Sequence, residues 1–509
     1  MTKEPHLNPL KERFFEALVQ RTLDRWHVPG MAVAMVDGDH TWAEGYRLAI
    51  LPSTSVTPST LFYAGSTTKA FTAAMLVKLT EDSATTIQWD TPISQLLPGD
   101  FALPDKWVGD QITVEDALSH RTELPSHDHA SSRTSVHENV RQLAHLPLTA
   151  KLRTRYQYCN LMYVVASHII ETVTGQRLGD CLARSFWLPL GMTDTYFNLI
   201  DAQAAPKTLA QGYCYSAYSS GDRDPRDPRD DDIYHKVDWM PVEEVSGAGA
   251  IITNVLDYAK WVRALLRPQT LVDKDIFRSL EIVHQLWQPR TLMPTEAPFT
   301  GRAYALGWRT ACYLGIQIYE HSGGMNAFGA QLLLVPELQF GVVILANTTQ
   351  TSNYAAQLLA FHLLDERLGI PREQRFDWNR RNWSLIKQEK QRVADKVNYR
   401  SPIVLPLTLP LDEYAGTYTH AGYKDITVYF SEGVLHADRK DMTWPETIRF
   451  QHVTGEHFLM LSAHNEDFGA FCPEVYDAEF RISIQGKPWI LGVAWERAMG
   501  GEKIWFVRV

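Results

Sequence analysis

The chain has 509 residues, of which 45% are hydrophobic and 21% are charged, and its formal net charge at pH 7 is −10. Such a length exceeds one ordinary hydrophobic core, so we expect a globular protein with a large domain and a smaller one. The acidic balance, and the lack of a basic stripe with interleaved aromatic residues, argue against nucleic acid as a partner.

Residues 1–26 have an amphipathic helical pattern with charges throughout, without the apolar stretch of a signal peptide. No stretch approaches the roughly 18 apolar residues that a membrane-spanning helix needs, so we expect no membrane partner. The five cysteines are widely separated and form no C-x-x-C pair, which argues against a disulfide framework and against a redox couple. We therefore expect a cytoplasmic protein, and the sequence makes no prediction of its oligomeric state.

The predicted elements begin with two strands around a turn in residues 31–50. A long helical region follows Ser66, and residues 156–175 are typical of a loop that enters a helix. Residues 315–324 and 330–347 contain three apolar runs separated by Gly, Pro and Asn, which favours neighbouring antiparallel strands. Strands first, a helical middle and strands again predict an α+β fold, with one sheet covered by helices.

The C-terminal part differs in character. Residues 219–232 are charged and almost without apolar side chains, which favours a solvated loop over a binding arm. A polar helix pattern over 376–398 and the Pro-bearing stretch 401–411 indicate a connector, and the last hundred residues alternate strand-like runs with turns, as in a small all-β barrel. The predicted organisation is a first domain over 1–370, a connector over 371–406 and a barrel over 407–509.

The stretch "AGSTTKA", residues 64–70, places Ser66 and Lys69 one helical turn apart, so that the lysine amine can reach the serine hydroxyl. A lysine acts as a base only if burial lowers its pKa, and the apolar run that follows Lys69 provides that burial. A second Ser-x-x-Lys, Ser384 to Lys387, lies in the charged connector and lacks such a setting. The alternative is that Ser66 only caps a helix, with Lys69 reaching to solvent.

A serine acyl-transfer site needs a second proton-handling group and donors for the oxyanion. "RYQYCNLMY" supplies Tyr158 and Asn160 in a loop before a helix, and "EHSGGMNAFG" supplies a histidine followed by small residues on an apparent strand. The strand residues in question are His321, Ser322, Gly323 and Gly324.

Taken in this order, the three motifs resemble those of the serine β-lactamase and penicillin-binding-protein family, S-x-x-K, Y-x-N and then K-T-G or H-x-G. The pattern is most similar to class C enzymes, D-aminopeptidases and related esterases, and the resemblance covers roughly residues 15–365. The C-terminal sequence is similar to the lipocalin-like domain that follows some members. Two decoy pairs, Tyr196 with Asn198 and His420 with Gly422, do not fit the family's order and setting.

The resemblance implies an antiparallel sheet with a helical lobe, and a pocket between them. It also implies an acyl-enzyme on Ser66, with Lys69 and Tyr158 sharing the proton transfer in roles that can be exchanged. Asn160 would orient Lys69 and the substrate, and backbone N–H groups of Ser66 and Gly324 would hold the oxyanion. The residues expected to bind substrate are Asn160, His321, Ser322, Gly323 and Gly324.

Two departures bear on the substrate. Glu123 stands in "HRTELP" where relatives carry a glycine, so a side chain would narrow or recharge the pocket mouth, or the loop would differ. His321 stands where lactam-recognising relatives often have a lysine, and a histidine is mostly neutral at pH 7. We therefore expect a preference for esters or amides without a carboxylate beside the scissile carbonyl, and weak β-lactam hydrolysis.

The predicted function is a serine hydrolase, an esterase or amidase that acts on small intracellular metabolites. The alternatives are an acyltransferase, a β-lactamase or D-aminopeptidase, and a catalytically silent binding protein. An α/β-hydrolase is disfavoured, because the sequence contains no Gly-x-Ser-x-Gly motif, the nucleophile elbow of that fold. His127 and His129 in "SHDHA" lack the further ligands of a zinc hydrolase, which favours a surface loop there, and we expect neither a metal nor a cofactor.

Overall fold

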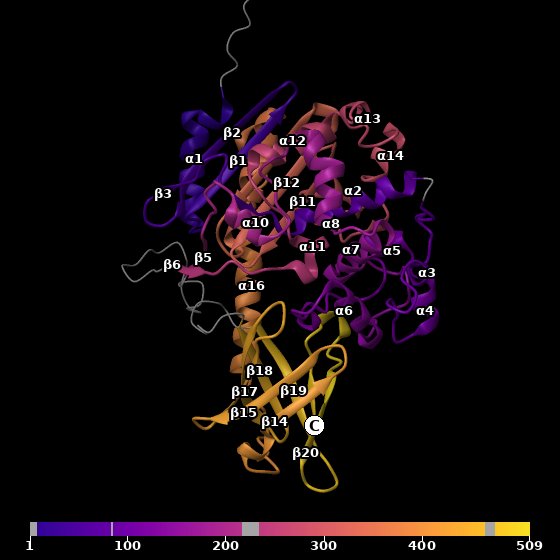
Figure 1. Cartoon of the computed structure of the whole chain (residues 1–509). Helices are drawn as coiled ribbons and strands as arrows, with labels where there is room; N and C mark the ends of the chain where they lie inside the picture. Colours follow the sequence, from indigo (N-terminus) through magenta and orange to yellow (C-terminus); the bar gives the residue numbers. More distant parts are fainter. Residues whose placement is uncertain (1–7, 83–84, 216–233, 464–473) are drawn as a thin grey trace, which may run out of the picture.

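The computed structural model describes residues 8–82, 85–215, 234–463 and 474–509 (Figure 1). It contains an α+β body, formed by the N-terminal three quarters of the chain, and a β-barrel that lies at one end of this body. Both parts were expected. The charged segment 219–232, predicted to be a solvated loop, lies outside the described residues.

The body is built on a nine-stranded sheet in which all pairs are antiparallel. The two strands predicted within 31–50 and the three predicted between 315 and 347 are confirmed. In spatial order the strands are β3 (Thr54–Ser55), β2 (His40–Ile50), β1 (Gly30–Asp37), β13 (Phe340–Ala346), β12 (Phe328–Val335), β11 (Ile316–Met325), β10 (Arg309–Tyr313), β9 (Phe299–Tyr304) and β8 (Thr291–Leu292).

Helices cover both faces of this sheet, which explains why the central strands β12 and β13 are buried along their whole length. On one face, α1 (Arg13–Arg25), α15 (Thr351–Arg367) and the start of α16 (Trp378–Asn398) share a hydrophobic core with the sheet. On the other face, α12 (Val255–Leu266) packs on β13 and β1. The sheet is therefore the middle layer of three.

The helical lobe adjoins the second face. Its central helices are α2 (Thr68–Glu81) and α7 (Asn160–Thr174), which contact each other. The remaining helices are α3 (Ile93–Leu96), α4 (Lys106–Gln111), α5 (Val114–Leu118), α6 (Val136–Arg141), α8 (Leu178–Leu182), α9 (Leu188–Leu190), α10 (Leu199–Ala204), α11 (Ser246–Gly249), α13 (Gln269–Asp273) and α14 (Leu280–Gln285).

A short strand fixes the segment before α2: β4 (Phe62–Tyr63) pairs with β7 (Ile252–Thr253). A second small sheet pairs β5 (Gly212–Tyr215) with β6 (Tyr234–Val237). The helix predicted to start at Ser66 begins at Thr68, because residues 65–67 form a 3₁₀ turn in which Gly65 has a φ of +53°. Tyr258 donates to Thr67 Oγ1 at 2.8 Å and holds this turn from the side of α12.

The C-terminal barrel is closed and has eight strands, as expected for the last hundred residues. The domain limits that the sequence predicts, at 370 and 406, stay a prediction. The barrel strands are β14 (Gly416–His420), β15 (Lys424–Ser431), β16 (Val434–Arg439), β17 (Glu446–Thr454), β18 (His457–Ala463), β19 (Glu474–Ile482), β20 (Pro488–Val493) and β21 (Ile504–Arg508).

Barrel and body are joined by main-chain hydrogen bonds and by a continuous core. Arg133 N donates to Asp441 O, and Thr443 N donates to Ser131 O, both at 2.9 Å, so the loop between β16 and β17 extends the body's own backbone pairing. One hydrophobic cluster runs from the helical lobe into the barrel interior.

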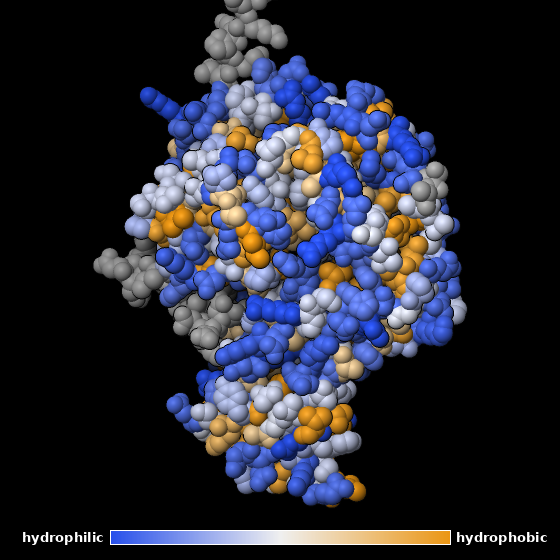
Figure 2. All heavy atoms as spheres, in the orientation of Figure 1, coloured by the Kyte–Doolittle hydropathy of each residue, from blue (hydrophilic) through white to orange (hydrophobic). Residues whose placement is uncertain are grey.

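On the face shown in Figure 2, hydrophilic side chains prevail. None of the described helices is long and apolar enough to cross a membrane.

Two adjacent glycines of β11 should differ in how much stability the protein loses when each is replaced by alanine. A Cβ at Gly323 would lie 2.0 Å from Ala64 O, whereas the nearest atom to a Cβ at Gly324 is Asn353 Oδ1 at 3.8 Å. Gly323→Ala should therefore force β11 away from the 3₁₀ turn and lower the free energy of unfolding by about 1–3 kcal/mol. Gly324→Ala is the matched control and should unfold like the parent in a urea titration. Equal losses in both variants would contradict the close approach.

Candidate functional site

Ser66 and Lys69 meet at the start of α2, where the lysine amine has three close neighbours. Lys69 Nζ lies 3.1 Å from Ser66 Oγ, and it donates to Asn160 Oδ1 at 2.7 Å and to Ala248 O at 2.9 Å. In its neutral form the amine keeps both donations and turns its lone pair to the serine hydroxyl. Ser66 itself is only partly buried. The geometry pairs an accessible hydroxyl with a base beside it.

Burial makes the lysine a usable base. Lys69 is fully buried, and this desolvation lowers the pKa of its amine from 10.5 to about 7, against the opposing negative charge of Asp128. The rings of Tyr158 and Tyr163 lie 5.0 and 5.3 Å from Nζ. The alternative in which Lys69 extends to solvent is therefore wrong, since α2 is buried on almost all sides.

Tyr158 lies in the loop that leads into α7 and contacts both Ser66 and the histidines of the site. Burial raises the pKa of the Tyr158 hydroxyl above its ordinary value, and a hydrogen bond with Ser66 opposes this. Its ring stands 4.3 Å from that of His120 and 6.3 Å from that of His321. The phenol therefore stays protonated at neutral pH and offers its proton to a group bound at Ser66.

Asp128 is a positioning residue that the motifs do not reveal. Its Oδ1 accepts a hydrogen bond of 3.0 Å from Asn160 Nδ2, and this fixes the amide so that Oδ1 of Asn160 faces Lys69. Burial raises the pKa of the Asp128 carboxyl, against the hydrogen bond from Asn160. Asp128 belongs to "SHDHA", a stretch in which the sequence drew attention only to the histidines.

His321 lies beneath the site and is neutral at pH 7. Its Nδ1 is 2.7 Å from Ser322 O, which only accepts, so Nδ1 carries the proton and Tyr304 O–H donates to Nε2 at 2.9 Å. Burial and the charges on Arg309 and Lys69 hold the pKa of His321 well below its ordinary value. Neutrality was expected, and its cause is burial.

Arg309 changes the expected electrostatics of this wall. It donates to Ser322 Oγ at 3.1 Å, and Glu320 lies 4.0 Å away from its guanidinium. A positive charge thus stands beside the strand, although residue 321 carries none, and the Glu320 carboxylate partly offsets it. The expected preference for substrates without a carboxylate stays a prediction. The sequence motifs do not include Arg309, which comes from the neighbouring strand β10.

Gly323 and Gly324 bring β11 against the turn that carries Ser66. A Cβ at Gly65 would lie 2.8 Å from Gly324 N, which places the Gly324 amide beside the serine, and Gly324 is exposed while Gly323 is buried. All the residues that the sequence proposed for the site thus lie on two walls, one made by α2 and the 156–160 loop and the other by β11.

Glu123 does not narrow the pocket mouth. It keeps the left-handed backbone that a glycine would allow, with φ +63°, and its buried carboxylate turns inward to the loop before Tyr158. It accepts from Thr154 N at 2.7 Å, Arg155 N at 2.8 Å and Gln157 Nε2 at 3.0 Å. The strained backbone is offset by three hydrogen bonds to a charged acceptor, so Glu123 shapes the loop.

The surface-loop interpretation of His127 and His129 is wrong, because the barrel covers them. His127 Nδ1 lies 2.5 Å from Tyr423 Oη, and His129 pairs with Glu446 of β17. Among the described residues, the one group with ligand atoms close enough for a metal ion is Asp100, His137 and His168, in the helical lobe. Both histidines already donate to the Asp100 carboxylate, at 2.8 and 3.0 Å.

The pKa of Lys69 predicts how activity depends on pH. Only the neutral amine accepts the serine proton, so kcat/KM should rise with pH below about 7 and level off above it. Glu496, whose pKa burial raises to about 7, is the group to exclude, so the profile is measured with an uncharged ester, for which Glu496→Gln should keep the same midpoint. A profile measured from pH 5 to 9 that is flat, or that loses its midpoint in Glu496→Gln, would contradict this assignment.

Comparisons with known proteins agree with this architecture. The β-lactamase family model matches residues 15–365, and a domain of unknown function, DUF3471, matches residues 404–508. "Unguisins hydrolase ungD'" of Aspergillus campestris is 44% identical over 98% of this chain and 92% of its own length.

Solved structures show the same fold at low identity. The octameric penicillin-binding protein homologue from Pyrococcus abyssi is 21% identical, with a TM-score of 0.59 over 96% of this chain and 98% of its own. A D-amino acid amidase from Ochrobactrum anthropi SV3 is 21% identical, with a TM-score of 0.53 over 69% of this chain and 99% of its own. Through the match over residues 15–365, which contains the sheet and the Ser66 turn, the chain belongs to the β-lactamase family.

Proposed function

We propose that the protein is a serine hydrolase that cleaves an amide or ester through an acyl-enzyme on Ser66. The observation that carries this proposal is the accessible Ser66 hydroxyl, 3.1 Å from a lysine amine whose pKa burial lowers to about 7. A helix cap needs no such base. The same pair argues against a catalytically silent binding protein. Burying a lysine costs stability, and titratable groups with strongly shifted pKa values cluster at functional sites.

In the first half of the reaction, Ser66 Oγ attacks the scissile carbonyl carbon and its proton passes to Lys69. The oxyanion accepts hydrogen bonds from the backbone N–H groups of Ser66 and Gly324. The C–O or C–N bond of the substrate then breaks, and the leaving alcohol or amine takes a proton through the Tyr158 hydroxyl. Lys69 Nζ and the Tyr158 hydroxyl both contact Ser66 Oγ, so the two groups share one proton relay and their roles can be exchanged.

In the second half, a nucleophile attacks the acyl-enzyme, the Ser66 ester breaks, and the proton returns to Oγ. Water as this nucleophile makes a hydrolase, and an alcohol or amine makes an acyltransferase. The relative at 44% identity is named a hydrolase, which favours water. Product analysis with and without an added amine separates the two, because only an acyltransferase forms the amine adduct as its main product.

The serine mechanism predicts a single labelled residue. A fluorophosphonate should form an adduct on the peptide that contains Ser66, and Ser66→Ala should abolish labelling and cost about 10³-fold or more in kcat. The matched control is Ser384→Ala, since Ser384 precedes Lys387 with the same spacing on the exposed side of α16. Full activity in Ser66→Ala, or an adduct on Ser384, would refute the proposal.

Activity should survive removal of divalent metal. The proton relay and the backbone oxyanion donors leave no step for a cation, and the Asp100, His137 and His168 group belongs to the helical lobe rather than to the Ser66 walls. The measurement is kcat/KM before and after dialysis against a chelator. A loss that zinc restores, and that His137→Ala reproduces, would contradict the metal-free mechanism.

A further inference from the structure

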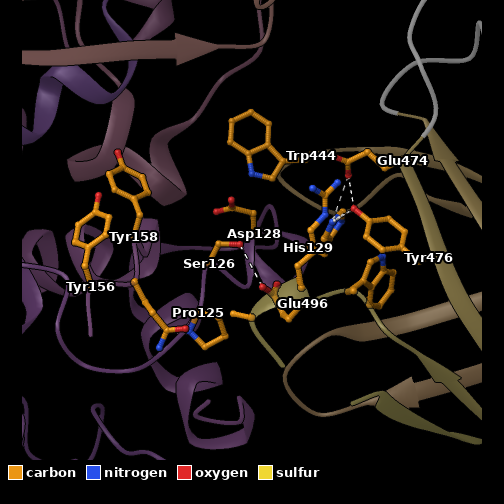
Figure 3. Close-up of a pocket in the computed structure, with 14 residues that line it drawn as sticks. Pro125, Ser126, Asp128, His129, Tyr156, Tyr158, Trp444, Glu474, Tyr476 and Glu496 are labelled. Carbon is orange, nitrogen blue, oxygen red and sulfur yellow. Dashed lines mark hydrogen bonds and ion pairs between the residues drawn. The ribbon is translucent and has the colours of Figure 1, made fainter. Parts of the chain in front are cut away.

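A cavity of about 640 Å³ lies between the helical lobe and the barrel (Figure 3). Tyr156 and Tyr158 form one side of it, and the loop 125–129 runs along its base. The barrel supplies the other side, with Trp444, Glu474, Tyr476, Trp495, Glu496 and Arg497. The cavity thus needs both domains, which explains why neither half of the sequence indicated it.

The cavity adjoins the reacting groups. Tyr158 lines it and is hydrogen bonded to Ser66, and Asp128 lines it and holds Asn160. A substrate whose carbonyl reaches Ser66 past Tyr158 therefore has this space for the rest of its length. A ligand pocket of several hundred Å³ accommodates a group as large as an amino-acid residue or two.

Two of the carboxyl groups that line the cavity, those of Asp128 and Glu496, have no ion pair with a charged group among the described residues. Asp128 accepts from the neutral amide of Asn160, and Glu496 accepts from Ser126 Oγ at 3.4 Å. His127 lies 3.8 Å from Glu496, but burial lowers the pKa of that imidazole to about 4, so it is uncharged at pH 7. Glu474 accepts from the Tyr476 hydroxyl, lies 3.7 Å from His129 Nε2 and is about half-exposed.

The cations nearby, His129 and Arg497, are already in ion pairs. Burial opposes the charge on His129, yet the carboxylates of Glu446 and Glu474 raise its pKa to about 9, and its close partner is the buried Glu446. Arg497 pairs with Glu389 of α16 at 2.7 Å. Burial raises the pKa of Asp128, and it raises that of Glu496 to about 7, because neither carboxyl group has a cation beside it. A protonated amine that enters the cavity would supply this missing partner and favour the charged form of Glu496.

Aromatic rings make up much of the remaining wall, and their faces attract cations. Tyr156, Trp444 and Tyr476 surround the carboxylates from both domains (Figure 3). Trp495 is 3% exposed, and its indole N–H has no partner among the described residues. The lining thus offers carboxyl and hydroxyl acceptors beside aromatic faces, which complement an amine.

We propose that this inter-domain cavity is a substrate subsite that binds a protonated amine of the substrate, with Glu474 and Glu496 as its charge-recognising residues. The inference rests on the proposed function, because it assumes that the substrate acylates Ser66. It deepens that function by naming the substrate class: amides or esters of an amine-bearing, peptide-like molecule that extends beyond the scissile bond into the barrel. The barrel is then a specificity element.

The test uses pairs of fluorophosphonates on the full chain. Each pair has the same alkyl tail, ending in an ammonium group or in a methyl group of similar size, and the tail length is increased along the series. The readout is the second-order rate constant for labelling Ser66, followed by intact mass. At one tail length the ammonium probe should react at least tenfold faster, and Glu474→Gln with Glu496→Gln should bring the ratio near one. Glu432→Gln, at an exposed turn of the barrel, should keep the ratio.

The outcomes separate the two proposals. Absence of labelling by every probe, or labelling that persists in Ser66→Ala, overturns the serine mechanism and the subsite with it. Labelling of Ser66 at equal rates for both members of every pair leaves the mechanism intact and overturns the subsite. A preference for ammonium that survives Glu474→Gln with Glu496→Gln also overturns it, because the charge would then be recognised elsewhere.

Discussion

The removal of the Lys69 amine from water is the constraint on which the rest of the structure depends. An amine loses solvation when it is buried, and the fold must return enough hydrogen bonds to keep it in place without restoring its charge. Asn160 and the Ala248 carbonyl supply two of them. In the proposed mechanism the Ser66 hydroxyl is therefore activated by packing, because the elements around α2 exclude water from the Lys69 amine.

The dry environment is assembled from distant parts of the chain. The turn that carries Ser66 follows β4, which pairs with β7; Tyr258 of α12 donates a hydrogen bond to the turn, and β11 lies against it. The Asn160 amide is in turn held by Asp128, whose neighbours His127 and His129 are clamped by the barrel. A chain of contacts thus leads from the C-terminal domain to the base, so the barrel's position and the lysine's environment are set together.

The sequence was informative where a residue's role follows from its own neighbours. The apolar run after Lys69 predicted its burial, and the strand and barrel patterns predicted the fold, because periodicity records which face is buried. Asp128, Glu123 and Arg309 could not be assigned in this way. Their partners lie in other loops and strands, so their roles depend on tertiary contacts. The histidines at 127 and 129 were misplaced for the same reason, since no local pattern shows that a second domain covers a loop.

The sheet order also constrains how the chain folds. The hairpin of β1 and β2 is the first part of the sheet to be synthesised, but β1 also pairs with β13, near the end of the body, with Met31 opposite Ala346. Such a pairing closes a very long loop, and topologies of this kind fold slowly. During synthesis the edge of β1 that later pairs with β13 therefore stays unpaired until most of the body has been made. In this period it can pair with strands of other chains. We therefore expect fragments that lack β13 to aggregate, and we expect low temperature or chaperones to improve the yield of the folded chain.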